Sequence, residues 1–380
     1  MRNMGILRIG FKLLVNDKGK FFALLLGITF SVFLMMQTTS MFVGILNRAY
    51  STVTNIGASV WVMDPAVTTP SSPIPLPDKL LNAVRSLDGV SYAVPVFIGG
   101  GQVRLTDGTY QGVSVIGLDD QTLFGRPLLE QGEIKDIFAD NGFIVVHDSE
   151  FSKLENPQLG TNFELNDHRS VIVGIAAVAA NGLNGVPTLY TTFHRATSYI
   201  PTSRFNISYI LVQPKSEAAV ISIQRAVAEL GYVAKTKKEF NDAVTSFYVF
   251  KTGVGVNILM MTVISFIVGL SISGTTFFTF ILENLDKFGA LKAIGAKNSQ
   301  LILMIFFMAT FTSLTGYGLG IGLVTMMIMI AHANLPNYAA IITYTNLFGA
   351  FVLVLFMAAL SSYIGIRKVL KIEPFDIFRS

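Results

Sequence analysis

Charged side chains are missing from three long stretches of the chain, and all three are rich in apolar residues. They are Phe21–Asn47 with 27 residues, Thr252–Leu282 with 31 and Asn298–Ile366 with 69. A helix that crosses a bilayer needs about 20 apolar residues, so the first two stretches each hold one span. The third holds two spans, divided by a turn at His332–Tyr338, where Pro336 and two Asn interrupt the apolar pattern. The pattern predicts four transmembrane helices, at 21–47, 252–282, 298–331 and 343–366, with a short outer loop at 332–342.

Between the first two spans, residues 48–251 change to short runs of β-branched and aromatic residues separated by turn signals. Such runs are typical of strands, and helical periodicity interrupts them twice. The helices are expected at about 77–87 and at 216–230, where Ser216 is the expected N-cap. Six strands are expected, at 59–63, 102–105, 111–116, 142–146, 170–174 and 207–212. Strands with two interleaved helices predict an α+β domain of 204 residues.

Four shorter stretches of this segment carry local predictions. Asp107-Gly108 is typical of a hairpin turn, and Gly99–Gly101 is expected to form a turn or bulge between strands. The proline-rich stretch 68–77 is expected to be an extended connector. From Lys238 to Lys251 the apolar residues recur with helical spacing up to the second span. This spacing predicts one long helix that links the segment mechanically to the membrane.

The distribution of charge predicts how the chain crosses the membrane. Only 14% of the residues are charged, where a soluble domain has about 25%. Residues 1–20, 283–297 and 367–380 together carry 12 basic and 5 acidic groups, whereas residues 48–251 carry 16 basic and 19 acidic groups. Basic residues favour the cytoplasmic side, so both termini and the 283–297 loop are expected there, with 48–251 outside. The basic character of the chain therefore indicates topology, and nucleic acid is not an expected partner.

The first 20 residues form a cytoplasmic segment for which two interpretations remain open. Arg8, Lys12 and Asn16 recur every four residues, while apolar residues lie elsewhere on the helical wheel. Residues 4–16 could therefore form an amphipathic helix on the inner leaflet. The alternative is an ordinary basic flank of the first span.

Candidate chemistry in the chain is sparse. The pairs His147-Asp148 and Asp167-His168 lack the i,i+4 spacing of helical metal ligands, and the sequence contains no H-E-x-x-H or G-x-S-x-G motif. We therefore expect no catalytic residue, and no metal or cofactor bound by this chain. The four predicted spans contain no Asp, Glu, Lys or Arg, which disfavours a transporter that powers itself. Two overlapping G-x-x-x-G spacings predict a helix-packing face formed by Gly316, Gly318, Gly320 and Gly322.

The loop between the second and third predicted spans contains the sequence GALKAIGAKNS at residues 289–299. A phosphate loop has four residues between its glycines and then Lys at once. Here five residues separate Gly289 from Gly295, and Ala296 precedes Lys297. A phosphate cradle does not tolerate this shift, so the stretch is expected to serve a nucleotide-binding partner instead of binding a nucleotide itself.

The same loop resembles the cytoplasmic coupling segment of the FtsX/macrolide-exporter class of ABC permeases. The resemblance rests on the run from Glu283 to Lys297, on the layout of one span, a large outer domain and three spans, and on a terminal Pro-x-x-x-x-Arg motif at Pro374 and Arg379. Within this class the chain is most similar to DevC-type permeases, through the loop and through 163–169 and 186–192. Many relatives have a second acid where this chain has Lys287.

The resemblance implies a membrane subunit of a tripartite exporter in the bacterial inner membrane. It implies a cytoplasmic ABC ATPase that binds ATP and Mg²⁺, a periplasmic adaptor, a TolC-like outer-membrane channel, a homodimeric permease, and a lipid or glycolipid cargo. The loop would offer the ATPase a surface of low relief, with Phe288 and Leu291 as anchors and Lys292 at a polar rim. The expected coupling residues are Glu283, Lys287, Phe288, Gly289, Leu291, Lys292, Ala293, Gly295, Ala296, Pro374 and Arg379.

Two other functions remain open. The chain could relay force from an ATPase to a periplasmic hydrolase without transport, as cell-division relatives do. It could also be a membrane receptor or scaffold without an ATPase, in which the loop is a simple amphipathic connector that tolerates bulky substitution.

Overall fold

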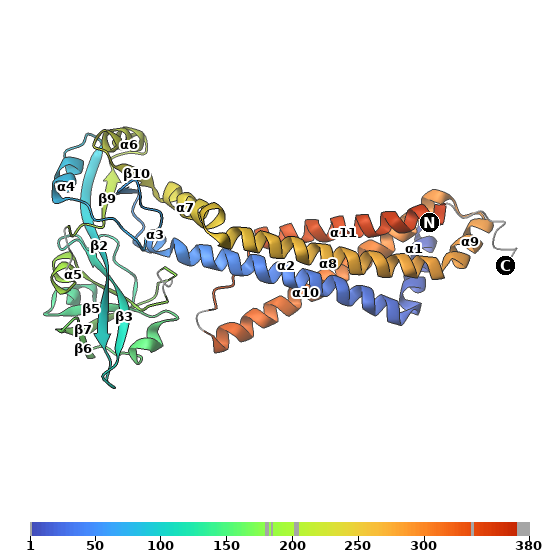
Figure 1. The fold of residues 1–380 in the computed structure, drawn as a ribbon, viewed down its shortest axis with the longest axis horizontal. Helices are drawn as coiled ribbons and strands as arrows, with labels where there is room; N and C mark the ends of the chain where they lie inside the picture. The colour runs from blue at the N-terminus through green and yellow to red at the C-terminus, as the bar shows by residue number, and fades with distance from the viewer. Residues whose placement is uncertain (1, 179–181, 184, 201–204, 336–337, 371–380) are drawn as a thin grey trace. The chain divides into compact units, whose positions relative to one another are not determined.

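The computed structural model describes residues 2–178, 182–183, 185–200, 205–335 and 338–370. The chain forms two compact units, each described here by itself. The membrane unit comprises Met1–Gly44 and Val254–Ser380, and the outer domain comprises Ile45–Gly253. Figure 1 shows helices alone in the described part of the membrane unit, and strands in the outer domain.

Four helices of the described chain are long and apolar enough to cross a membrane, as the charge-free stretches predict. They differ from the predicted spans by at most four residues at either end, and α10 continues through His332 to Asn334. A short helix precedes the first span and another follows the second. In chain order the helices are α1 Arg2–Asn16, α2 Lys18–Ala49, α8 Gly253–Glu283, α9 Leu285–Ala293, α10 Asn298–Asn334 and α11 Tyr344–Leu370.

Small residues let the long helices approach one another closely. Ser31 of α2 donates its hydroxyl hydrogen bond to the carbonyl oxygen of Ser265 in α8, at 2.7 Å. A Cβ at Gly316 would lie 2.8 Å from Ile28 of α2, and one at Gly320 would lie 2.7 Å from Val32. Because association in lipid depends on close packing, these two glycines fix the contact between α10 and α2. Gly318 and Gly322 are exposed, and a Cβ there would meet nothing within 4 Å. Among the described residues, one of the two G-x-x-x-G spacings, Gly316 and Gly320, therefore packs against another helix of the chain.

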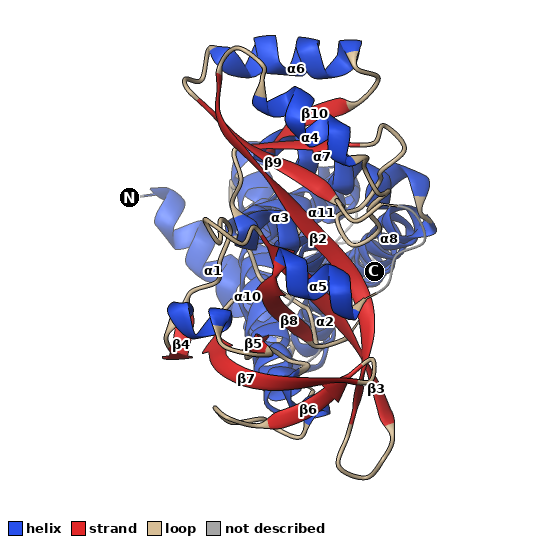
Figure 2. Cartoon of the chain, turned by 90° about the vertical axis from the view of Figure 1, so that its left-hand side faces the viewer, coloured by secondary structure: helices blue, strands red, loops and turns tan. Residues whose placement is uncertain are grey.

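The outer domain is built on a ten-stranded sheet whose main path runs β10-β1-β9-β2-β3-β8-β5-β7-β4, with β6 paired to β2 and β7. The 15-residue strand β2 pairs through its first part with β9 and through its second part with β3, so it belongs to both halves of the sheet. Figure 2 shows this strand running the length of the domain. The strands are β1 Val60–Met63, β2 Val90–Arg104, β3 Tyr110–Leu118, β4 Leu129–Gly132, β5 Gly142–Val146, β6 Asn162–Leu165, β7 His168–Ala176, β8 Thr188–Thr192, β9 Tyr209–Pro214 and β10 Val233–Thr236.

Short helices and turns complete the domain. They are α3 Ser51–Ile56, α4 Asp78–Arg85, α5 Phe193–Tyr199, α6 Ala219–Glu229 and α7 Lys237–Ser246, with the single-turn elements η1 Ile134–Phe138, η2 Phe151–Leu154 and η3 Phe247–Lys251. One side of β1 and β9 packs on α4 and α6 through Val62, Leu80 and Ile223, among others. The other side buries Trp61 and Tyr209 against Phe240 of α7. The α+β class predicted for this segment is confirmed.

Three local predictions fail for identifiable reasons. Gly99–Gly101 lies inside β2, because its backbone pairs with Val113–Val115 of β3. Ser216 does not cap α6 with its side chain; its carbonyl oxygen accepts a turn hydrogen bond from the N–H of Ala219. The stretch 68–77 contains a turn closed by the hydrogen bond from Ser72 N–H to Thr69 O, so it is not extended throughout. The hairpin turn at Asp107-Gly108 is confirmed, and Gly108 has the positive φ of +85° that such turns favour.

The helix predicted to run unbroken from Lys238 into the second span is interrupted. The α-helical pattern of α7 ends at Ser246, and one π-helical turn, η3, follows. Thr252 then adopts extended torsions, φ −101° and ψ 155°, before α8 begins at Gly253. The apolar residues keep their periodicity across this point, although the backbone hydrogen-bond ladder does not continue.

The glycine packing gives a matched test. Gly320→Leu forces a side chain into Val32, whereas Gly322→Leu on the same helix adds one to an exposed position. Overpacking costs about 1–3 kcal/mol, while the gain in helix propensity is the same in both variants. We expect Gly320→Leu to lower the thermal unfolding midpoint of the detergent-solubilised chain by several degrees relative to Gly322→Leu. Equal midpoints would show that the α2–α10 contact is not tight.

Candidate functional site

The junction between α8 and α9 is held by one buried side chain. Asn284 is only 5% exposed, and its Nδ2 donates a 2.8 Å hydrogen bond to the carbonyl oxygen of Phe280, in the last turns of α8. Its own carbonyl oxygen accepts from the backbone N–H groups of Lys287 and Phe288, in the first turn of α9. The Nζ of Lys287 donates to Asn284 Oδ1 at 2.8 Å. Asn284 therefore ends one helix and starts the next, which fixes α9 relative to the second span.

Phe288 attaches α9 to the helix bundle. Its side chain is 1% exposed and lies in an apolar cluster with residues of α1, α2, α8, α10 and α11. Leu291 packs against the same cluster, and Gly289 is also buried. Phe288 and Leu291, the predicted anchors for an ATPase, therefore pack against their own chain. The sequence does not indicate which side of α9 is buried, because its apolar residues are spread around the helix.

A glycine-dependent turn ends α9. The backbone N–H of Ala296 donates to Leu291 O at 2.9 Å, and that of Gly295 donates to Lys292 O at 3.1 Å. These are the two bonds of a Schellman motif, in which the residue after the cap is left-handed. Gly295 occupies that position with φ +101°. Its role is to end the helix, and this signal is present in the sequence as a glycine after an apolar-periodic run.

The exposed side of this segment carries small residues and one large apolar side chain. Ala290, Ala293 and Gly295 are exposed, and Ile294 is 85% exposed. Ala296 and Lys292 are half-buried, and Lys292 Nζ donates to the carbonyl oxygen of Leu370 at 3.4 Å. The surface of low relief predicted from sequence is therefore present at Ala293 and Gly295, and its apolar projection is Ile294, which sequence reasoning did not single out. We call Ala290, Ala293, Ile294 and Gly295 the exposed face of α9.

Charged side chains connect the ends of α2 and α8. Lys20 Nζ forms an ion pair with Glu283 and a 3.0 Å ion pair with Asp17 Oδ2. The hydrogen bond from Lys20 lowers the pKa of Asp17 from its ordinary value. Glu283, expected to face a partner, therefore has a partner within its own chain. Pro374 and Arg379 lie outside the described residues.

Each described histidine of the outer domain has different neighbours. His147 Nδ1 lies 2.8 Å from Glu130 Oε2, and His168 stacks on Tyr199 with ring centroids 4.4 Å apart. The backbone N–H of His194 donates to Asp120 Oδ1. Within the described ranges, no three His, Asp or Glu residues gather in a way that could hold a metal ion.

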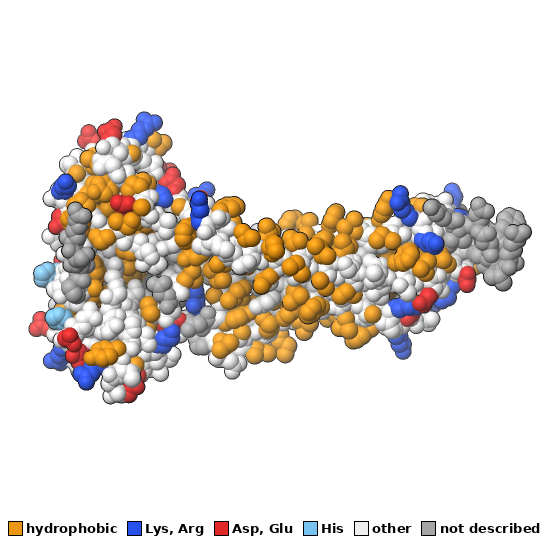
Figure 3. All heavy atoms as spheres, in the orientation of Figure 1, with side chains coloured by type: hydrophobic (Ala, Val, Ile, Leu, Met, Phe, Trp, Pro, Cys, Tyr) orange, Lys and Arg blue, Asp and Glu red, His pale blue; other side chains and the backbone are white. Residues whose placement is uncertain are grey.

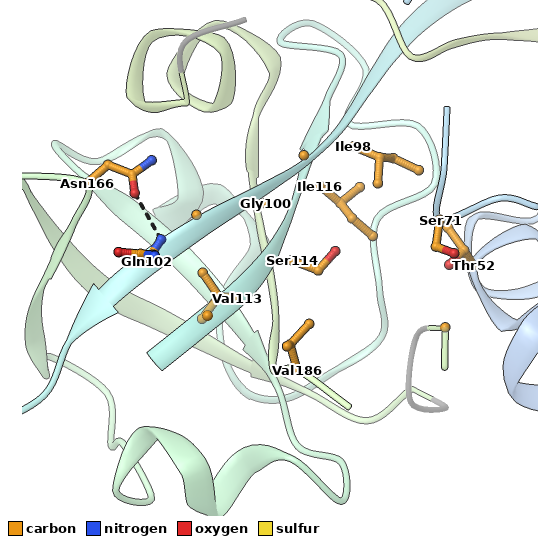
Figure 4. A pocket seen from close by; sticks show the side chains of 14 residues that line it. Thr52, Ser71, Ile98, Gly100, Gln102, Val113, Ser114, Ile116, Asn166 and Val186 are labelled. Carbon is orange, nitrogen blue, oxygen red and sulfur yellow. Dashed lines mark hydrogen bonds between the residues drawn. The ribbon is translucent and has the colours of Figure 1, made fainter. Parts of the chain in front are cut away.

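A groove of about 580 Å³ lies on one face of the β2–β3 hairpin (Figure 4). Gly100 and Ser114 of the hairpin line it, and Thr52 and Ser71 lie across from them. Its described lining offers hydroxyl, amide and main-chain groups and contains no ionisable side chain. The groove can accept hydrogen-bonding groups without charge, but its described lining contains no general acid or base.

Two neighbouring acids, the half-buried Asp148 and the buried Glu150, lie close to the end of α2. Glu150 is 2% exposed and pairs with Lys153, and its backbone N–H donates to Asp148 Oδ1 at 2.8 Å. Arg48 Nη2 donates to Ser149 Oγ at 3.3 Å. Burial raises the pKa of Asp148 to about 6, the charge of Glu150 adds to this effect, and the charge of Arg48 opposes it.

Comparison with known proteins identifies both units. The MacB-like periplasmic core domain family matches residues 21–230, and the FtsX-like permease C-terminal family matches residues 258–374. The periplasmic region of MacB from Actinobacillus actinomycetemcomitans is similar at 14% identity and a TM-score of 0.37, covering 50% of this chain and 95% of that one. The extracellular domain of YknZ, a noncanonic ABC-type transporter from Gram-positive bacteria, is similar at 15% identity and a TM-score of 0.36, covering 47% of this chain and 99% of that one. The architecture of four transmembrane helices with a periplasmic α+β domain between the first and second is confirmed.

The pair of acids Asp148 and Glu150 predicts that the stability of the chain depends on pH. The pKa of Asp148 rises from an ordinary 3.8 to about 6 on folding, so the folded chain holds this proton more tightly than the unfolded chain. Its contribution to the free energy of unfolding is therefore largest below pH 4 and is lost as the pH rises through 6. Asp148→Asn keeps the acceptor oxygen and removes the titration. We expect the thermal unfolding midpoint of Asp148→Asn, taken as a difference from that of the unchanged chain, to increase as the pH is raised from 4 to 7. A difference independent of pH would contradict the buried titration.

Proposed function

This chain belongs to the family of permeases with a MacB-like periplasmic core domain, and on that basis we propose that it is the membrane subunit of an ATP-driven tripartite exporter. The family implies an ABC ATPase as partner. In the proposal, this ATPase binds ATP and Mg²⁺, and the permease binds neither. The permease is a homodimer of the DevC type in the bacterial inner membrane. A periplasmic adaptor and a TolC-like outer-membrane channel complete the assembly, whose cargo is a lipid or glycolipid.

The exposed face of α9 is the observation that carries this proposal. Phe288 and Asn284 fix the helix from its buried side, while Ile294 extends from the turn with 85% of its side chain exposed. A fixed helix with a free apolar residue and small neighbours is suited to binding a groove in a second protein, because little conformational entropy is lost on binding. The ATPase binds here through Ile294 and Ala293, instead of through Phe288 and Leu291.

The charge distribution supports the orientation that this proposal needs. In the view of Figure 3, Lys and Arg side chains gather at the end of the membrane unit that carries α9, and apolar side chains cover the middle of its long helices. With the large domain in the periplasm, the positive-inside rule favours cytoplasmic positions for the N-terminus, α9 and the C-terminus. An ATPase in the cytoplasm then reaches the exposed face of α9 directly.

The proposed mechanism is the transmission of movement. Closure of two ATPases on ATP brings two copies of α9 together, and each α9 moves with its α8 because Asn284 joins the two helices by hydrogen bonds. The second span carries this displacement to the periplasmic domain. The permease contributes positioning and movement to the cycle, and the chemistry of ATP hydrolysis belongs to the partner.

Substitution of Ile294 tests the proposed ATPase contact. Ile294→Asp changes an exposed side chain, so the fold is preserved while an apolar interface residue is lost. Burying such a side chain contributes about 1.5–3 kcal/mol, so we expect the ATPase recovered with the permease to fall about tenfold or more. Ile221→Asp, at a position of the periplasmic domain that is 58% exposed, is the matched control.

The measurement is co-purification from membranes in mild detergent, with every recovered polypeptide quantified by mass spectrometry. An ATPase with an adaptor supports the exporter, and an ATPase with a periplasmic hydrolase supports a force relay without transport. If the unchanged permease recovers no ATPase while a known ABC complex survives the same procedure, the chain is a receptor or scaffold. Equal ATPase recovery with Ile294→Asp and the control would place the contact elsewhere.

A further inference from the structure

The helix α1 is attached to the membrane unit by one side only. A Cβ at Gly10 would lie 2.6 Å from the side chain of Met304, so the backbones of α1 and α10 approach closely at this point. Leu14, one turn later, is fully buried in the cluster that contains Phe288. Phe11 meets Phe311 of α10 edge to face, with ring centroids 5.2 Å apart. These contacts fix which side of α1 faces outward.

The outward side combines two basic residues with an apolar border. Arg8 and Lys12 are exposed and lie one helical turn apart. Phe11 (39% exposed) and Val15 (36%) lie along one edge of this pair, and Ile9 (42%) lies along the other. Together these five residues form what we call the basic face of α1. Such a face, basic in the middle and apolar at its borders, is typical of helices that lie in a membrane interface.

The two basic side chains of this face are available for a ligand. Neither Arg8 nor Lys12 takes part in a hydrogen bond or ion pair with any described residue. Lys20 and Lys287 differ in this respect, because Lys20 is paired with Asp17 and Glu283, and Lys287 donates to Asn284. A compensating charge for Arg8 and Lys12 must therefore come from outside this part of the chain.

The position of α1 along α10 places the basic face at the membrane boundary. With 37 residues, α10 is about 55 Å long, roughly 25 Å longer than the apolar core of a bilayer. Gly10 contacts Met304, six residues from the start of α10, and Phe11 contacts Phe311, seven residues further along. Phe11 therefore contacts α10 further from the start of that helix than Gly10 does. Arg8 and Lys12 can extend from this depth to the headgroup layer, because long basic side chains keep their charge in water while their stems lie in apolar surroundings.

We infer that the basic face of α1 binds the phosphate headgroups of anionic phospholipids. Two cations one turn apart match a phosphodiester, and the adjacent Phe11 and Val15 match the first methylenes of the acyl chains. An acidic protein would also attract Arg8 and Lys12, but it would leave the apolar border facing water. The lipid surface satisfies both parts of the face, and it lies next to α1 because α2 enters the membrane directly after it. This inference does not depend on transport or on an ATPase.

Native mass spectrometry of the purified full-length chain tests the inference. The chain is released from micelles that contain equal amounts of dioleoylphosphatidylglycerol and dioleoylphosphatidylcholine, and the retained lipids are counted. An anionic surface attracts each nearby basic residue with about 1 kcal/mol, which corresponds to about fivefold per charge. We expect the preference for phosphatidylglycerol to fall about fivefold for Arg8→Gln and further for Arg8→Gln with Lys12→Gln. Arg8→Lys with Lys12→Arg keeps both charges and is expected to keep the preference.

A matched control removes the same charge from the outer domain, through Lys79→Gln with Lys215→Gln, both at exposed positions. The inference is overturned if this control loses the preference as strongly as the α1 variant, or if neither variant loses it. It is also overturned if millimolar inorganic phosphate displaces phosphatidylglycerol, because the site would then be selective for a free anion. Unchanged thermal unfolding of the α1 variant excludes misfolding as the cause of any loss.

Discussion

One apolar cluster holds the membrane unit together at the end where α9 lies. It contains residues of all four long helices together with Leu14 of α1 and Phe288 of α9. In a bilayer the hydrophobic effect does not drive helices together, so their association depends on the fit of side chains such as Phe277, Phe280 and Met304. Because Phe288 fills a position in this cluster, α9 cannot shift without repacking its neighbours. The helix α9 is therefore part of the bundle, and among the described residues Ala290 and Ala293 lie on its exposed side.

Close contacts between small residues extend this constraint along the helices. Ser31 of α2 lies beside Gly269 of α8, where a Cβ on Gly269 would lie 2.2 Å from the Ser31 hydroxyl oxygen. The Ser31 hydroxyl also donates a hydrogen bond to the backbone of α8, at Ser265 O. On α10, Gly320 packs directly against the side chain of Val32 in α2. The first span thus contacts two other spans at backbone distance. The packing of α2 is therefore tied directly to that of α8 and of α10.

The sequence predicts the elements of this protein better than their buried sides. The four spans follow from the absence of charge, and the hairpin turn follows from Asp107-Gly108, because both signals are local. Gly99–Gly101 has the composition of a turn but is a strand, since β3 supplies its hydrogen bonds from a distance in sequence. In α9 the apolar residues are spread around the helix between Asp286, Lys287 and Lys292, so the sequence leaves the buried side undetermined. It does not distinguish Phe288, which enters the apolar cluster, from Ile294, which follows the helix and is exposed. The low relief expected at Ala293 and Gly295 depends only on residue size, and it is therefore present in the structure.

The two ends of α8 differ in a way that matters for transmitting movement. At Asn284 the side chain and the backbone are hydrogen-bonded to both α8 and α9, so a displacement of α9 is passed on with little loss. At the other end Thr252 has extended torsions, and both its backbone N–H, which donates to Phe247 O at 3.1 Å, and its hydroxyl, which donates to Tyr248 O, are bonded on the side of η3. In an ATP-driven permease, α8 would therefore follow α9 as a rigid lever.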